Sequence, residues 1–134
     1  MAQSFRSSEC TERASATGAA SIAFGLSILI LAAWIPSLPV ITAMAILTLG
    51  ATDATLARFR GTAALYPVML LHAATYALLY ALFIGATLHA TNAAASTASL
   101  SRWVLFDLAA STLPMALAVQ RIVGALRHSP ELKR

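Results

Sequence analysis

Four long apolar stretches make up most of this 134-residue sequence, and they constrain its fold more than any other feature. An α-helix rises ~1.5 Å per residue, so about 20 apolar residues are needed to cross ~30 Å of hydrocarbon. The stretches have about this length and lie at residues 19–35, 38–57, 65–88 and 100–119. The sequence therefore predicts an all-α fold, an integral membrane bundle of four transmembrane helices.

The composition supports one membrane domain and leaves no room for a second domain. Hydrophobic residues make up 59% of the chain and charged residues 10%, whereas soluble proteins carry about 25% charged residues. The segments outside the apolar stretches are too short to bury a core of their own. We expect a transmembrane domain at residues 18–122, a mobile polar tail at residues 1–17 and a basic cytoplasmic tail at residues 123–134.

The basic residues are distributed unequally between the two ends of the predicted bundle. If the N-terminus is cytoplasmic, four spans place only Arg102 outside and the other eight Lys and Arg residues inside: Arg6, Arg13, Arg58, Arg60, Arg121, Arg127, Lys133 and Arg134. Basic residues favour cytoplasmic loops, so we expect a multi-pass protein of the cytoplasmic (inner) membrane with both termini cytoplasmic. Trp34 and Trp103 then fall at the outer interface and Tyr66 at the inner one, where aromatic residues are enriched.

Three ionisable residues lie inside the predicted spans: Asp53, His72 and Asp107. Such groups cost several kcal/mol in a bilayer unless they are paired, so each is a candidate functional residue. Asp53 and His72 both lie about 7–10 Å below the inner surface, on consecutive spans, and we expect them to face each other. In the alternative interpretation, Asp53 extends toward the loop residues Arg58 and Arg60.

His72, Tyr76 and Tyr80 recur every four residues and therefore share one helical face. We expect Asp107, in the outer third of the fourth span, to face Tyr80. Together with Asp53 these residues predict a polar ladder that crosses the membrane. The ladder is either a proton or ion path or a set of interhelical hydrogen bonds that hold the bundle, worth about 0.6 kcal/mol each.

Small residues also recur every four positions on the third span, at Ala73, Ala77, Ala81 and Gly85. Small side chains let two helix backbones approach closely, so we interpret this stripe as a helix-packing surface. Because the third span carries both this stripe and the His/Tyr face, we expect it to be the most buried helix.

A proline interrupts the fourth span at Pro114. Proline lacks a backbone N–H, so it leaves the carbonyl of Ala110 without its helical partner and predicts a kink. We expect the hydroxyls of Ser111 and Thr112 to compensate in part for the lost bond.

The sequence lacks the residue patterns of several function classes. It contains no nucleophile-and-base arrangement, no phosphate-binding glycine loop, no HExxH motif and only one cysteine, Cys10, so we do not expect an enzyme or a metal site. His72 could supply one axial ligand to a haem, but ligation would need a homodimer or a partner subunit, and no cofactor is expected. No basic stripe with interleaved aromatic residues is present, so we expect no nucleic-acid partner.

These observations favour a non-catalytic small integral membrane protein. We expect an accessory, assembly or scaffold subunit that acts through helix packing. Its partners would be the lipid bilayer and either further copies, in a homo-oligomer, or a larger membrane complex. The alternative is a small proton-coupled transporter or channel that uses Asp107, Asp53 and His72.

Overall fold

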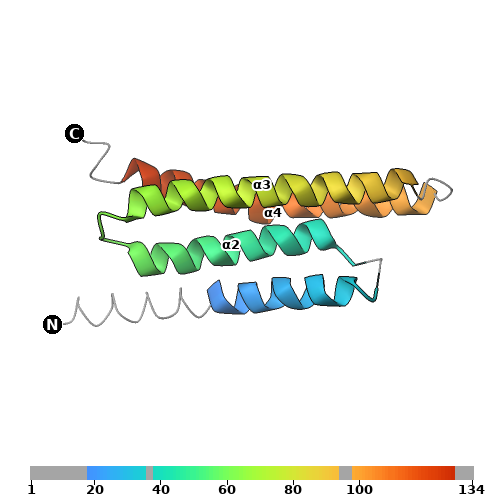
Figure 1. Ribbon diagram of the computed structural model, residues 1–134, viewed down its shortest axis with the longest axis horizontal. Coiled ribbons are helices and arrows are strands. Elements are labelled where there is room, and N and C mark those ends of the chain that lie inside the picture. The colour runs from blue at the N-terminus through green and yellow to red at the C-terminus, as the bar shows by residue number, and fades with distance from the viewer. Residues whose placement is uncertain (1–17, 36–37, 94–97, 129–134) are drawn as a thin grey trace.

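The computed structural model describes residues 18–35, 38–93 and 98–128, and this part of the chain forms four helices (Figure 1). The helices are Gly18–Ala32, α2 (Val40–Phe59), α3 (Leu65–Ala93) and α4 (Ala98–Arg127). By length and composition, α2, α3 and α4 can each cross a membrane, whereas the first helix is apolar but shorter. The predicted all-helical fold with four apolar helices is therefore confirmed. The tail predicted at residues 1–17, and the tail residues after His128, lie outside the described residues.

Two of the helices extend beyond the predicted spans. The third continues from the predicted end at residue 88 to Ala93, and the fourth continues from residue 119 to Arg127. Apolar residues persist at helical spacing in the added part of α4, where Ile122 is buried and Leu126 is half-buried. As a result, Arg121 lies within α4, two residues beyond the predicted end of the fourth span.

The helices run alternately up and down, so α2 and α4 are parallel to each other (Figure 1). The N-terminal end of the first helix lies at the same end of the bundle as the C-terminal end of α4. The connection from Phe59 to Leu65 is also at this end, and Gly61 in this turn has a φ of 80°. A left-handed residue of this kind is readily accommodated by glycine, and here it reverses the chain direction within a few residues.

The core lies between α2 and α4, which pack against each other more extensively than any other pair of the labelled helices. Its buried apolar side chains come mainly from these two helices, and α3 adds one long side chain. They are Ile41, Ala43, Met44 and Ala45 of α2, Met69 of α3, and Ala118 and Ile122 of α4. Three of these seven residues are alanines, whose small side chains allow the helices to approach closely.

The first helix packs against α2 through a seam of glycines. An added Cβ at Gly50 would lie 2.8 Å from the carbonyl oxygen of Gly18 and 2.8 Å from Cβ of Ser21. At the other end of the seam, a Cβ at Gly25 would lie 3.0 Å from the carbonyl oxygen of Ala43. Only residues without a side chain allow the two backbones to approach this closely.

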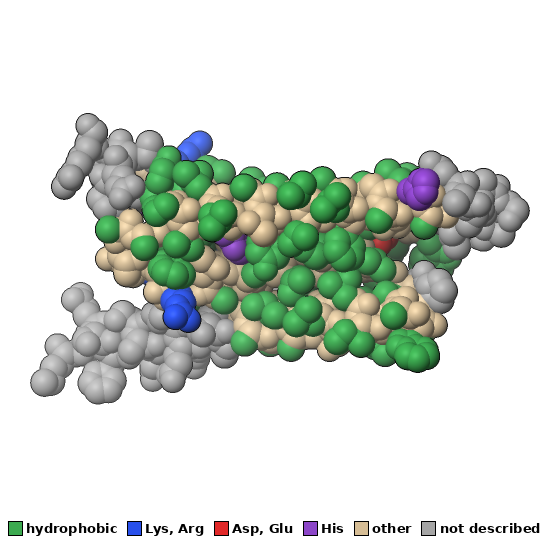
Figure 2. Space-filling view, in the orientation of Figure 1, with side chains coloured by type: hydrophobic (Ala, Val, Ile, Leu, Met, Phe, Trp, Pro, Cys, Tyr) green, Lys and Arg blue, Asp and Glu red, His purple; other side chains and the backbone are tan. Residues whose placement is uncertain are grey.

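The expectation that the third helix is the most buried is wrong within this chain. The apolar part of α3 is the least covered of the three long helices, and hydrophobic side chains extend along the visible face of the bundle (Figure 2). Ala77, Ala81 and Gly85 are exposed, and an added Cβ at Gly85 would meet nothing within 4 Å. These three residues of the predicted stripe therefore do not join helices of one chain, whereas Ala73 is half-buried. The role of the stripe between chains stays a prediction.

Candidate functional site

Asp107 of α4 binds the N-terminus of α2. Its carboxylate oxygens accept hydrogen bonds from the backbone N–H of Ile41 at 2.9 Å and of Thr42 at 2.8 Å. The hydroxyl of Thr42 lies 2.6 Å from the same carboxylate and 3.0 Å from the backbone carbonyl oxygen of Asp107. Asp107 is only 7% exposed, so this contact is part of the core.

The contact supplies the N-cap that α2 lacks in its own sequence. The residue before the helix is Pro39, whose side chain has no oxygen to accept a hydrogen bond. Ile41 and Thr42 are the second and third residues of α2, whose N–H groups an N-cap side chain normally satisfies. A carboxylate is also favoured at this position by the positive end of the helix dipole. Asp107 therefore acts as an N-cap provided by another helix.

One turn further along α4, Ser111 joins α4 to α3. The hydroxyls of Tyr80 and Ser111 lie 2.6 Å apart, and Ser111 is fully buried. The Ser111 hydroxyl donates to the carbonyl oxygen of Leu108 at 2.7 Å. Because a serine has a single O–H, Tyr80 must be the donor in the contact with Ser111.

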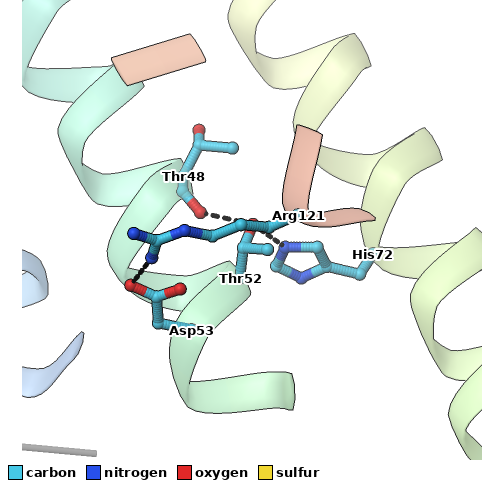
Figure 3. A network of polar contacts seen from close by, with 5 residues as sticks. All are labelled: Thr48, Thr52, Asp53, His72 and Arg121. Atoms are coloured by element: carbon cyan, nitrogen blue, oxygen red, sulfur yellow. Dashed lines mark hydrogen bonds and ion pairs between the residues drawn. The ribbon is translucent and has the colours of Figure 1, made fainter. Parts of the chain in front are cut away.

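His72 of α3 makes a polar contact with α2 in the half of the bundle that carries the α2–α3 turn. Its Nε2 lies 2.8 Å from the hydroxyl oxygen of Thr52, and its ring is 4.6 Å from the ring of Tyr76. The Thr52 hydroxyl donates to the carbonyl oxygen of Thr48 at 2.8 Å (Figure 3). It can therefore only accept from His72, which assigns the proton to Nε2.

Asp53, the next residue of α2, forms an ion pair with Arg121 of α4. The arginine side chain extends across α2 toward the carboxylate, beside the Thr52–His72 contact (Figure 3). The side chain of Arg121 is 42% exposed and that of Asp53 is 18% exposed. This pair lies at the edge of the core, in contrast to the buried Asp107 contact.

The residues of the predicted ladder have partners in the structure other than those expected. Asp53 contacts Arg121 and neither His72 nor the loop arginines, and His72 contacts the residue that precedes Asp53. Asp107 faces the interior as expected, but its partners are the first residues of α2 and not Tyr80. The partner of His72 is thus one residue before the one expected, and the partner of Asp107 is on α2 and not on α3.

Among the residues that the structure describes, these hydrogen bonds do not form a continuous relay along the bundle. Tyr80 donates to Ser111, and Ser111 donates to the backbone carbonyl of Leu108. In the same way, His72 donates to Thr52, and Thr52 donates to the backbone carbonyl of Thr48. A peptide carbonyl has no exchangeable proton to pass on. The described polar residues thus form separate contacts, each of which joins two helices.

Sequence reasoning missed the partners of these groups, namely Thr42, Thr52, Ser111 and Arg121. A signal was available for the first, because α2 begins after a proline and has no local capping residue. A signal for Arg121 was the apolar pattern that continues past residue 119. Threonine and serine give no such signal, since their hydroxyls usually bond to their own helix.

The described residues contain no group of three or more His, Cys, Asp or Glu side chains that could hold a metal ion. Comparisons of the chain with protein-family models, curated proteins and solved structures give no match.

Proposed function

We propose that this chain is a non-catalytic integral membrane protein, an accessory, assembly or scaffold subunit that acts through helix packing. The observation that carries the proposal is the use of Asp107, whose two carboxylate oxygens are both engaged by α2. In the interior of a membrane protein, a carboxylate in such a contact holds helices together.

In this proposal the four helices cross the cytoplasmic membrane and both termini are cytoplasmic. Support comes from the positions of the described arginines. Arg58, Arg60, Arg121 and Arg127 belong to the half of the bundle that carries the α2–α3 turn, and Arg102 belongs to the opposite end. Trp34 and Trp103 belong to the opposite end and are exposed. This combination of basic and aromatic ends is typical of a protein in a bilayer.

The surface for partners in this proposal is the uncovered side of α3. Its exposed positions combine small residues, Ala77, Ala81 and Gly85, with leucines such as Leu78 and Leu82. Small residues at this spacing are typical of helix–helix contacts in membranes. A second copy and a helix of another subunit would both fit.

The alternative is a small proton-coupled transporter or channel that uses Asp107, Asp53 and His72. One observation favours a transporter: the polar contacts follow one another along the bundle, and all of them lie between α2, α3 and α4. The end of each hydrogen-bond chain on a backbone carbonyl disfavours it. We therefore rank it second.

Site-directed photo-crosslinking in cells tests the proposal. A photoreactive residue at Ala81 should form a protein adduct, either with a second copy or with one recurrent partner. The matched control is Leu113 of α4, which is also exposed and apolar. The same mass for the Ala81 adduct in repeated experiments, with no adduct at Leu113, would support packing through α3.

Proton uptake by proteoliposomes tests the alternative. We expect the wild-type chain to give the same uptake as empty liposomes. Uptake that is present in the wild type and lost in both Asp107→Asn and His72→Phe would overturn the proposal and establish the transporter.

In the crosslinking experiment, adducts with lipid alone at both Ala81 and Leu113 would show that packing through α3 is wrong.

A further inference from the structure

The polar contacts of α4 are distributed unequally on the two sides of Pro114. On the N-terminal side, Asp107 binds α2 and Ser111 binds α3. On the C-terminal side, among the described residues, the ion pair of Arg121 with Asp53 is the one polar contact to another helix. Pro114 thus separates the half of α4 with polar contacts to both α2 and α3 from the half with a single polar contact, to α2.

Pro114 also weakens the helix between these two halves. Its ring nitrogen cannot donate to the carbonyl of Ala110, so one backbone hydrogen bond is missing at this point. We expected the hydroxyls of Ser111 and Thr112 to compensate. They instead bond the carbonyls three residues before them, at 2.7 and 2.6 Å, which leaves Ala110 without compensation from either hydroxyl. Side-chain bonds of this kind also favour bending of a helix.

The two contacts that attach α4 to α2 differ in strength. Asp107 is 7% exposed and accepts from two N–H groups and a hydroxyl, so its loss would leave buried donors unpaired. The ion pair is less buried, since the side chain of Arg121 is 42% exposed and that of Asp53 is 18% exposed. The Asp107 contact is thus the more buried of the two and comprises more hydrogen bonds.

Apolar packing holds the C-terminal half of α4 to the core through two side chains. Two of its side chains, Ala118 and Ile122, are buried, and one of these is only a methyl group. An added Cβ at Gly124 would meet nothing within 4 Å. The last turns of the helix therefore have space around them.

We infer that the segment Pro114–Arg127 is a hinged arm, and that the Asp53–Arg121 ion pair is the latch that holds it against α2. The arm is about 20 Å long at ~1.5 Å per residue, and a kink of about 20° would move its end by about 7 Å. Opening leaves the Asp107 and Ser111 contacts in place, because both precede the hinge. It uncovers Thr52 and His72, beside which the arginine lies (Figure 3).

Distance measurements between pairs of spin labels test the latch, with the full chain in lipid nanodiscs and Cys10 replaced by serine. The pair across the arm is Ala63→Cys with Val123→Cys, both at exposed positions. The control pair on the other side of the hinge is Ala33→Cys with Leu105→Cys, which are also exposed. With Asp53→Asn, we expect the arm pair to gain a population about 7 Å longer and the control pair to stay unchanged.

Two further variants separate a latch from a general loss of structure. Pro114→Ala, added to Asp53→Asn, restores the missing backbone bond and should return the arm pair to the wild-type distance. The exchanged pair, Asp53→Arg with Arg121→Asp, should do the same by remaking the ion pair. Both results would support the hinge and the latch.

Three outcomes would overturn the inference. The first is an unchanged arm distance in both Asp53→Asn and Arg121→Gln. The second is an equal change in the control pair. The third is failure of both single variants to fold, because the ion pair would then be a permanent structural contact.

Discussion

Asp107 accepts hydrogen bonds from both the backbone N–H and the hydroxyl of Thr42, although 65 residues separate the two in the chain. The contact joins the first turn of α2 to the N-terminal half of α4, which runs parallel to it. It fixes the position of α4 along α2 and satisfies two N–H groups that have no partner within α2.

Replacement of Asp107 by alanine should destabilise the bundle strongly. The N–H groups of Ile41 and Thr42 would be left buried and unpaired, at a cost of about 3 kcal/mol. Asp107→Asn should cost less, because its amide oxygen can still accept one of the bonds. Reversible unfolding in mixed micelles measures the free energy of both variants. Leu113→Ala, at an exposed position of α4, is the control, and an equal loss there would refute the assigned role.

The glycine seam predicts opposite effects of the same substitution at two positions. Gly50→Ala should lower the stability by about 1–3 kcal/mol, because its Cβ would meet the backbone of Gly18 at 2.8 Å. Gly85→Ala should leave the stability of the monomer unchanged or raise it by up to ~1 kcal/mol, because the site is open and alanine favours helix. Thermal unfolding in micelles that contain the monomer distinguishes the two. A similar effect at both positions would mean that the seam is packed less closely than described.

The partner of His72 can be identified with two double-mutant cycles. His72→Phe combined with Thr52→Val should show a coupling energy of about 0.6 kcal/mol, the average for hydrogen bonds between membrane helices. His72→Phe combined with Asp53→Asn should show a coupling near zero, because Asp53 is paired with Arg121. The free energy of unfolding of each variant supplies the cycles. A larger coupling to Asp53 than to Thr52 would restore the pairing expected from helix depth.

The two tryptophans provide a test of membrane insertion. Trp34 and Trp103 are both exposed and lie at the same end of the bundle. We expect lipids brominated near the headgroup to quench the fluorescence of both more than lipids brominated near the chain ends, since tryptophan prefers the interface. The variants Trp34→Phe and Trp103→Phe report each residue alone. Fluorescence that no brominated lipid quenches would exclude the proposed insertion.

The sequence by itself determined that the chain is helical and how many helices it has. Apolar runs of membrane length are local features, and so are the turns between them, marked by Pro39 and Gly61. Helix formation satisfies every backbone group within a segment, so length and apolarity are enough to predict it. The proposed insertion into a membrane and the proposed orientation rest on the distribution of apolar, basic and aromatic residues.

Only the tertiary structure decided which residues are partners. The periodicity of α3 identified the face with His72 and Tyr80, but it could not rank this face against the alanine stripe for burial, because both are equally regular. The choice between Thr52 and Asp53 as the partner of His72 depends on a rotation of one residue, about 100° around α2. The cap at Asp107 depends on the axial position of two helices that are distant in sequence. Such contacts arise from the packing of whole helices, and no local pattern encodes them.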